Sequence, residues 1–572
     1  MPSIAQEGSL RTFWSPNRLD IRAEVWIPLV LVVGALGYPL FLLLTSAFNV
    51  GDPEQFPARV YGFDNFVKLS RHLDWISNTL IVASGGTVLG IAIGVSLAWV
   101  IHRTTMPGRK WFDLLIAIPY PLGPLVGALA WSQLGAPRDG LINRVFTAVT
   151  GIQSPLIDIY TPFGIIFTEA VFEAPVAVLI IGAAMQRMDP ALEESSTIFG
   201  AGKLRTACKI TLPLMMPAIL SAALFMFTSM IGSFAIPTML GASSRFYVST
   251  NAMYILLQGY PPNYPLAAAL GLVLIAMTAI AVWLVQRVLR GRSYVVVSGK
   301  NYRPRQVKMG WMTWVLFAGA LIYVMLSLVL PMGTLLLASF QSSNAINFDF
   351  ASWTLHNYKY VMFDFPTTQQ AIVNSLILGV GTGTFGVVFA TFIAIATHRS
   401  TSRGRKLLEQ VTMLPQAFPR LIFAIGFLWM ILTLPIQLYG TLLAVLLAYV
   451  VVFLPLAYRG MSGVVVQIDK SLEEAARVSG ASPVRVLRTV MLPLLRPGLV
   501  ATWALLFMVS VREIGASLFL SGTNTQVLGP AIFSFWDSGG MPRVSALAVV
   551  QALIILIALT VVRFTADRGV RV

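Results

Sequence analysis

Charged side chains and cysteines are scarce in this sequence. Charged residues make up only 11% of its 572 residues, against about a quarter in soluble domains. The one cysteine, Cys208, excludes an internal disulfide and a cysteine-based metal cluster. The HExxH and CxxC motifs and a Ser/His/Asp arrangement are missing as well, so we predict neither a metal site nor enzyme chemistry.

Long apolar runs take the place of charge. Hydrophobic residues form 56% of the sequence and the mean hydropathy is +0.76. Runs of roughly 20 apolar residues, the length that crosses a bilayer, recur along the chain. The pattern predicts an all-α polytopic membrane protein with about 12 transmembrane helices in a lipid bilayer. We expect these helices near residues 26–48, 78–101, 111–135, 161–186, 213–240, 265–289, 312–340, 371–397, 408–434, 438–458, 493–520 and 545–563.

Basic residues explain the formal net charge of +16. They gather in the loop after the second run (Arg103, Arg109 and Lys110), in a matching loop at 398–406, and in the segment 291–311. Lys and Arg are typical of the cytoplasmic loops of membrane proteins, so we expect both termini to face the cytoplasm. The charge then follows from membrane orientation, and nucleic acid is not an expected partner.

The sequence contains an internal repeat. HRTTMPGRK at 102–110 matches HRSTSRGRK at 398–406, an offset of 296 residues (398 less 102). Residues 193–217 match 473–497 at an offset of 280 (473 less 193). Six runs separate each matching pair, so the halves are parallel repeats with the pore expected between them. We divide the chain into a first half at 1–290, a basic cytoplasmic linker at 291–311 and a second half at 312–572.

Each half has one long loop between its fourth and fifth runs, at 187–212 and 467–492. In both loops a Glu is followed six residues later by a Gly and then by Leu-Pro. This spacing predicts a short helix, a break at a glycine with positive φ, a second amphipathic helix, and re-entry into the membrane at the proline. Such a loop is suited to docking into a groove of another protein.

The second of these loops, EEAARVSGASPVRVLRTVMLPLLRP at 473–497, resembles the EAA coupling-helix motif of type I ABC importer permeases. The first, EESSTIFGAGKLRTACKITLPLMMP at 193–217, is similar but has Ser195 and Ser196 where the family usually has alanines. We refer to 187–212 and 467–492 as the first and second coupling loops. The residues that the resemblance assigns to ATPase coupling are Glu193, Glu194, Gly200, Leu212, Pro213, Glu473, Glu474, Ala475, Ala476, Gly480, Leu492 and Pro493.

The resemblance also implies partners and a mechanism. Permeases of this kind form the pore, and two copies of a separate ABC ATPase subunit bind ATP and Mg beneath it. An extracytoplasmic substrate-binding protein delivers the substrate, and the pore alternates between inward-open and outward-open states. The expected location is a bacterial inner membrane, and no cofactor is expected in this chain.

A nucleotide site in this chain itself is not expected. The string FGAGKL at 199–204 contains Gly-Lys, but a phosphate-binding loop needs Gly, four residues, and Gly-Lys followed by Ser or Thr. Leu204 follows Lys203, and Thr197 stands where the first Gly is required. ATP hydrolysis is therefore expected in the partner subunits.

Ionisable residues inside apolar runs are costly and indicate functional positions. The fourth run carries Glu169 and Glu173 on one helix face, the eleventh carries Arg512 and Glu513, and Ser233 matches Glu513 in the first half. In one interpretation these five residues line the translocation pathway, where the acidic groups attract a cation. In the other, Arg512 and Glu513 have a structural role, with one or both paired within the bundle, and one or both glutamates of the fourth run lie near the outer interface and touch water.

The substrate is predicted only from resemblance. FMVSVREIGASLFLSG at 507–522 and FSFWDSGGMPRVSALAVVQALI at 533–554 resemble ferric-iron importer permeases, with thiamine and aminoethylphosphonate importers as near relatives. Acidic groups along the pathway favour a cation, so ferric iron is the expected substrate, with thiamine, aminoethylphosphonate or a polyamine as alternatives. An ion-coupled secondary transporter would account for the runs and the repeat, but not for the doubled coupling loop.

Overall fold

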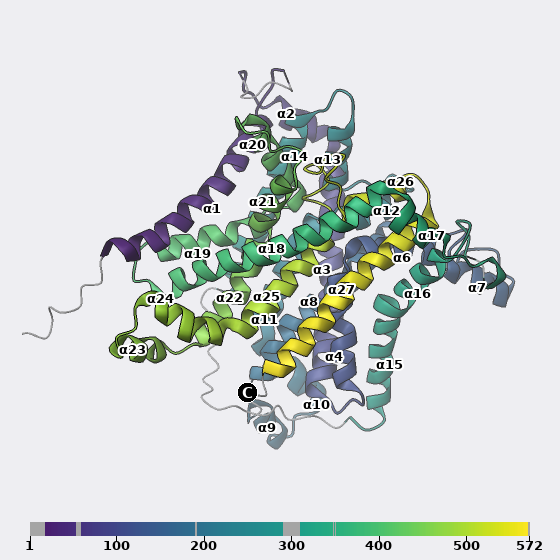
Figure 1. Cartoon of the computed structure of the whole chain (residues 1–572). Helices are drawn as coiled ribbons and strands as arrows, with labels where there is room; N and C mark the ends of the chain where they lie inside the picture. Colours follow the sequence, from purple (N-terminus) through teal and green to yellow (C-terminus); the bar gives the residue numbers. More distant parts are fainter. Residues whose placement is uncertain are drawn as a thin grey trace, which may run out of the picture.

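The computed structural model describes residues 18–52, 59–188, 191–289, 309–346, 348 and 350–569 (Figure 1). Residues 291–308 of the basic linker and residues 189–190 of the first coupling loop lie outside these ranges. The described chain is built from helices that run between two opposite edges of the molecule.

The long helices of the first half are α1 (Arg18–Ala47), α3 (Leu73–Arg103), α8 (Pro162–Arg187), α11 (Leu212–Ile231) and α14 (Tyr264–Leu289). Its shorter helices are α2 (Asp64–Leu69), α4 (Arg109–Ala117), α5 (Pro119–Leu122), α6 (Pro124–Gly135), α7 (Leu141–Thr150), α9 (Ala191–Ile198), α10 (Lys203–Thr206), α12 (Ala235–Gly241) and α13 (Ser249–Gln258).

The second half follows the same order. Its long helices are α18 (Pro366–Arg399), α25 (Leu492–Val511) and α27 (Met541–Gly569), preceded by α15 (Met312–Val324) and α16 (Leu330–Ser339). Its shorter helices are α17 (His356–Lys359), α19 (Arg405–Met413), α20 (Arg420–Thr433), α21 (Leu442–Val452), α22 (Leu454–Gln467), α23 (Lys470–Val478), α24 (Pro483–Val486) and α26 (Leu528–Asp537).

The prediction of an all-α polytopic membrane protein is confirmed. In the described ranges nine helices are long and apolar enough to cross a membrane, and three bent helix pairs raise the number to twelve if each pair is one span. The expected third and ninth spans correspond to two of these bent helix pairs, with bends of 97° and 107°. The first bend falls at Gly123, whose φ of +94° and following Pro124 start a new helix direction.

The fifth and eleventh spans are shorter than expected. Helix α11 ends at Ile231 and α25 at Val511, and each is followed by an irregular segment instead of continuing to residue 240 or 520. Ser233, Arg512 and Glu513 therefore follow the helix ends and lie outside regular helix. Non-helical backbone at membrane depth is tolerated where it is buried in protein or lines a cavity.

A row of glycines packs the second span of the first half against its neighbours. Gly90 and Gly94, one helical turn apart, approach α11 and α8 so closely that an added Cβ would lie 2.2 Å from Met226 Cε and 2.4 Å from Ala177 Cβ. Small residues at this spacing let membrane helices approach closely. Gly386, which matches Gly90 at the 296 offset, approaches Leu506 of α25 in the same way.

The repeat is visible in matching hydrogen bonds. The Asn78 amide donates to the Tyr247 carbonyl and the Asn374 amide to the Gln526 carbonyl, both at 2.9 Å. The two asparagines match at the 296 offset, and each ties a second span to the segment after α12 or α25. The halves therefore share hydrogen bonding as well as sequence.

The two halves also exchange their first helices. Helix α1 packs on α19 and α20 of the second half, and α16 packs on α6 of the first half. Val25, Leu29 and Val32 of α1 are buried in one cluster with residues of α18 to α22. This exchange joins the halves along a large shared core.

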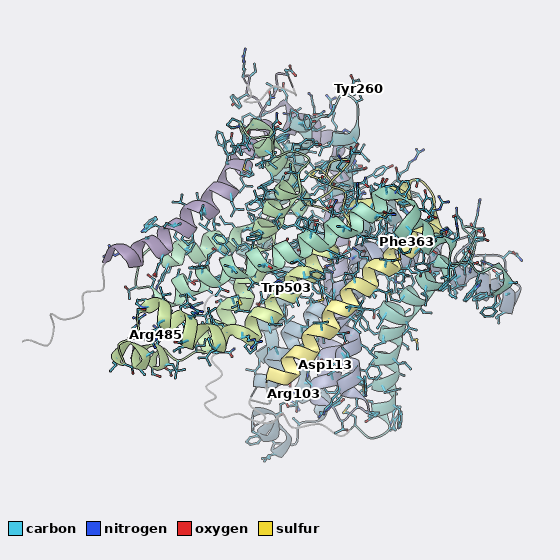
Figure 2. The ribbon with its side chains drawn as sticks, in the orientation of Figure 1. Arg103, Asp113, Tyr260, Phe363, Arg485 and Trp503 are labelled. Atoms are coloured by element: carbon cyan, nitrogen blue, oxygen red, sulfur yellow. The ribbon has the colours of Figure 1, made fainter. Side chains whose placement is uncertain are left out.

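The two coupling loops lie at the same edge of the molecule. In Figure 1, α9 and α10 (bottom) and α23 and α24 (lower left) lie along one edge, where α27 also ends, whereas α7 and α17 lie at the opposite edge. In Figure 2, Arg103 and Arg485 mark the first edge, and Tyr260 and Phe363 mark the second. Both loops can therefore be approached from one side of a membrane.

Candidate functional site

The second coupling loop has the predicted helix–glycine–helix shape. Helix α23 ends before Gly480, whose φ is +82°, and α24 begins at Pro483. The Asp469 carboxylate caps α23 by accepting from the Ser471 N–H at 2.9 Å. This hydrogen bond holds the pKa of the exposed Asp469 carboxyl below its ordinary value of 3.8.

The first coupling loop repeats this shape. Gly200 has a φ of +79° and separates α9 from α10. The Ala201 N–H donates to the Ser196 carbonyl at 3.1 Å, as the Ala481 N–H donates to the Ala476 carbonyl at 3.0 Å. The serines that depart from the family pattern therefore leave the turn unchanged.

The Leu-Pro pairs do not interrupt the helices that contain them. Leu212-Pro213 and Leu492-Pro493 lie inside continuous helical stretches that run through residues 207–231 and 483–511. A π-turn directly precedes each pair, at Ala207–Thr211 and Leu487–Met491. The wider turn accommodates the proline ring and its missing N–H without ending the helix.

The two glutamates of the second loop differ in their surroundings. Glu474 is exposed, whereas Glu473 is buried and forms an ion pair with Arg399 (Nε–Oε1 2.6 Å). Glu193 forms the matching pair with Arg103 (NH1–Oε2 3.4 Å), and the Glu194 side chain lies outside the described part of the chain. We did not predict the role of the arginines, although their His-Arg repeat was the signal that could have identified it.

The tips of the coupling loops present apolar side chains. Ile198 and Val478 match at the 280 offset and are 82% and 87% exposed. Phe199 and Val484 are exposed beside them, Ala475 is exposed, and Ala476 is half-buried. The two coupling loops therefore present equivalent exposed apolar side chains at one edge of the molecule.

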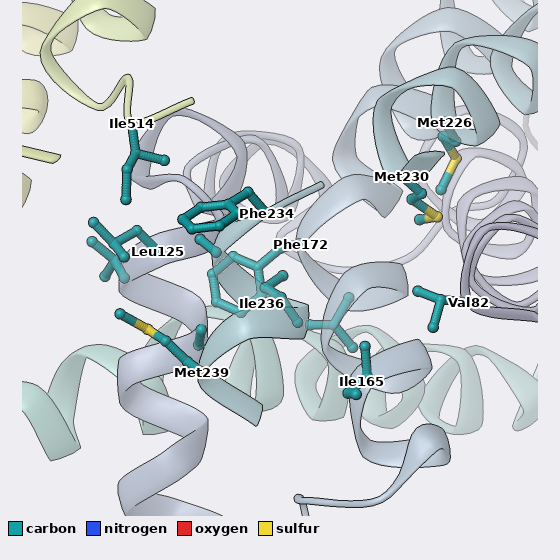
Figure 3. Packing of buried hydrophobic residues seen from close by; sticks show 14 of the residues in the cluster. Val82, Leu125, Ile165, Phe172, Met226, Met230, Phe234, Ile236, Met239 and Ile514 are labelled. Atoms are coloured by element: carbon teal, nitrogen blue, oxygen red, sulfur yellow. The ribbon is translucent and has the colours of Figure 1, made fainter. Parts of the chain in front are cut away.

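A cavity of about 170 Å³ lies between the halves. All five residues of the predicted pathway line it: Glu169, Glu173, Ser233, Arg512 and Glu513. Matched positions of the two halves line it together, including Tyr120 with Gln416 and Pro124 with Arg420 at the 296 offset, and Phe234 with Ile514 at the 280 offset. Figure 3 shows Phe234 and Ile514 close to each other, next to Leu125.

The contacts beside the cavity are reciprocal. A Cβ on Gly232 would lie 3.0 Å from Pro419 Cβ, and a Cβ on Gly123 would lie 3.0 Å from Arg512 Cδ. Gly232 matches Arg512 in the repeat, and Gly123 matches Pro419. The same pair of positions therefore meets twice across the cavity, as in an isologous interface between subunits.

The first-half wall of the cavity is acidic. Glu173 Oε1 accepts from the Ser229 hydroxyl at 2.9 Å, and the Ser233 side chain interacts with Glu169. Both glutamates are buried, at 1% and 6% exposure, so they do not touch outside water as one interpretation had it. Glu169 Oε1 and Glu173 Oε2 have no hydrogen-bond partner among the described residues.

The second-half wall is mostly basic. Arg420 NH1 pairs with Glu513 Oε2 at 2.8 Å, and the 43% of the Arg420 side chain that is accessible faces the cavity that it lines. Arg512 stacks over the Tyr120 ring at 4.6 Å and donates to the Tyr120 carbonyl oxygen, and Arg459 also lines the cavity. Glu513 is therefore paired within the described bundle, as the second interpretation has it for one or both of these residues, and its partner is Arg420.

The chemistry of the walls is inverted between the halves. Glu169 and Glu173 match Tyr449 and Phe453 at the 280 offset, whereas Ser233 matches Glu513. At two of these three matched positions a carboxylate and a hydroxyl are exchanged between the halves, whereas Glu173 has an apolar counterpart. Within the described residues, no group of three His, Cys, Asp or Glu side chains is placed to hold a metal ion.

The sequence matches a family model in both halves. Residues 86–294 and 386–570 match the family described as binding-protein-dependent transport system inner membrane component. Together these ranges cover more than half of the chain.

Curated relatives match most of the chain. A putative ferric transport system permease protein of Haemophilus influenzae is 27% identical over 526 residues, 89% of this chain and 79% of that protein. A ferric transport system permease protein of Actinobacillus pleuropneumoniae is 27% identical over 551 residues, 92% and 76% of the two chains. A spermidine/putrescine transport system permease protein of Escherichia coli is 28% identical over 230 residues, 40% of this chain and 86% of that protein.

Proposed function

The chain belongs to the family of inner membrane components of binding-protein-dependent transport systems, and we propose that it carries ferric iron. It is an ABC importer permease subunit with both halves of the pore in one polypeptide. In the proposed complex, two copies of a partner ATPase bind ATP and Mg and dock on the coupling loops. An extracytoplasmic binding protein delivers the substrate at the opposite edge.

The doubled coupling loop supports the ATPase part of the proposal. Two equivalent loops of the same shape, each with an exposed apolar tip, lie at one edge of the molecule. A symmetric pair of ATPase subunits requires two equivalent docking points. The basic loops beside them indicate that this edge, and with it both termini, faces the cytoplasm.

The acidic wall of the cavity is the observation that carries the substrate assignment. Glu169 and Glu173 line a space shared by the halves, and each has a buried carboxylate oxygen without a hydrogen-bond partner among the described residues. Carboxylate oxygens suit hard cations, and the relatives that span most of this chain are named for ferric transport. We assign Glu169, Glu173, Ser233, Arg512 and Glu513 to the translocation pathway.

The absence of a third nearby ligand from the described residues fits a pathway. A transport site must release its ion, so a complete coordination shell would work against transport. Two carboxylates supported by serine hydroxyls would hold a cation only weakly. In this proposal, selection for iron takes place mainly in the binding protein.

A polyamine is the second candidate substrate. The shorter relative named for spermidine and putrescine transport matches 40% of this chain, and carboxylates also bind ammonium groups. The guanidinium groups of Arg512 and Arg459 on the opposite wall would favour a substrate that carries an anionic group, such as aminoethylphosphonate. Thiamine is the remaining cationic alternative.

The test is uptake of radiolabelled ferric iron by cells that express the chain with its native partners. Unlabelled spermidine, thiamine and aminoethylphosphonate are added in turn as competitors. We expect uptake that none of them reduces, that Glu173→Gln lowers strongly, and that the exposed control Glu409→Gln leaves unchanged. Full inhibition by one competitor, or no iron uptake at all, would move the assignment to another substrate.

A further inference from the structure

Two arginines occupy equivalent positions at the ends of the second spans. Arg103 ends α3 and Arg399 ends α18, and they match at the 296 offset. Their side chains are 1% and 14% exposed, so both guanidinium groups are largely removed from water. A buried charge requires partners. In each half the partners come from two corresponding elements, the end of the fourth span and the coupling helix.

The first partner is a helix end. Arg103 NH2 donates to the Met185 carbonyl in the last turn of α8 at 2.9 Å. Arg399 NH2 donates to the Val465 and Ile468 carbonyls at the end of α22, at 3.2 and 2.7 Å. Carbonyls at a helix C-terminus have no partner within the helix, and a cation there also complements the helix dipole.

The second partner is the first glutamate of the coupling loop. Glu193 accepts from Arg103, Glu473 forms an ion pair with Arg399, and the two glutamates lie on α9 and α23. One guanidinium group therefore joins the end of the second span, the end of the fourth span and the coupling helix. Separating them would leave a poorly solvated charge without its partner, which costs far more than breaking an exposed ion pair.

The fourth spans lead directly to the cavity. Helix α8 carries Glu173, twelve residues before Met185 or about 18 Å along the helix axis. Helix α22 carries Arg459 between the cavity and the carbonyls that bind Arg399. In each half a single helix therefore connects the contact with the arginine to a side chain in the cavity wall.

We propose that Arg103 and Arg399 are positioning residues that make each coupling helix move together with the fourth span of its half. The inference rests on the proposed docking of partner ATPases on the coupling loops. The exposed Glu474 and the apolar tips of the two loops bind the ATPase, and the buried Arg–Glu pairs transmit its motion to the pore. Loss of the pair uncouples ATP hydrolysis from transport and leaves docking intact.

The first coupling helix has additional side-chain hydrogen bonds that the second one lacks. The Thr211 hydroxyl donates to Glu193 Oε1 at 2.7 Å, and the Ser196 and Thr206 hydroxyls are hydrogen-bonded at 2.9 Å. The matching residues of the second loop are Met491, Ala476 and Val486, which have no side-chain group for these bonds. The second coupling helix therefore depends more on its arginine, and Arg399 variants should have a larger effect than Arg103 variants.

The test uses the purified complex of the chain with its ATPase and binding protein in proteoliposomes. The variants are Arg399→Gln, Arg399→Lys, Glu473→Gln and the charge exchange Arg399→Glu with Glu473→Arg. The exposed Arg403→Gln in the same loop is the matched control. Three quantities are measured: the amount of ATPase that co-purifies, ATP hydrolysis with and without binding protein, and iron uptake.

We expect Arg399→Gln to retain the ATPase and its basal hydrolysis while uptake per ATP falls at least about tenfold. Arg399→Lys should restore part of the uptake per ATP because lysine keeps the charge but loses the planar fork. The charge exchange should restore little, because a carboxylate at position 399 cannot donate to the Val465 and Ile468 carbonyls. An unchanged uptake per ATP in Arg399→Gln, or loss of the ATPase together with uptake, would overturn the proposal. A wild-type complex that hydrolyses ATP in response to binding protein but carries no iron would instead refute the substrate assignment alone.

Discussion

Gly480 allows a clean test of the coupling-loop geometry. Its φ of +82° is unfavourable for any residue with a Cβ, and a Cβ built there meets no atom within 4 Å. Gly480→Ala therefore adds backbone strain of roughly 1–2 kcal/mol and no steric clash. That strain lowers the population of the native turn relative to alternatives by a factor of about 5–30.

The assay is co-purification of the ATPase with the permease, followed by uptake in the same preparation. We expect Gly480→Ala to weaken both, and Gly480→Asn to weaken them less because Asn tolerates positive φ. Gly463→Ala is the matched control, since Gly463 also has open space around it but lies in α22 with ordinary helical φ. Wild-type association in Gly480→Ala would refute the claim that docking depends on this turn.

Three further predictions concern the same elements. Glu474→Lys should abolish uptake and loosen the ATPase while membrane insertion stays normal, and normal uptake would contradict the assignment of the loop. Asn374→Ala removes the hydrogen bond to the Gln526 carbonyl and should cost roughly 1–3 kcal/mol, measured as a lower unfolding temperature in detergent. Because the pKa of Asp469 is lowered in the folded chain, its capping contribution is complete at neutral pH and is lost only as the pH falls through that lowered pKa. At pH 7 Asp469→Ala should therefore weaken ATPase co-purification, and Asp469→Asn should preserve it.

The fold could be predicted from the sequence where a local pattern determines it. Apolar runs located the membrane helices, and the spacing from Glu474 to Gly480 predicted the helix and the positive φ that follows it. The five polar residues that we expected along the pathway, inside or next to the apolar runs, all line one cavity. These features depend on neighbouring residues or on the cost of charge in a membrane, and both are visible in sequence.

What could not be predicted depends on backbone direction and distant contacts. Hydropathy treats 111–135 as one run, although Gly123 and Pro124 turn it by 97°. The same kind of bend places Arg420 in the cavity, opposite the acidic wall. The π-turns that keep Pro213 and Pro493 inside helices leave no sequence signal that a count of apolar residues detects. The pairing of Arg103 with Glu193 joins residues 90 apart, and only the packed helices bring them together.

The most direct test of the account is the energy source of transport. Proteoliposomes with the purified chain are supplied with ferric iron, the binding protein and either ATP with the partner ATPase or an ion gradient alone. We predict uptake only when ATP, ATPase and binding protein are all present, and none under any gradient without the ATPase. Uptake driven by a proton or sodium gradient in the absence of the ATPase would contradict the account and identify a secondary transporter.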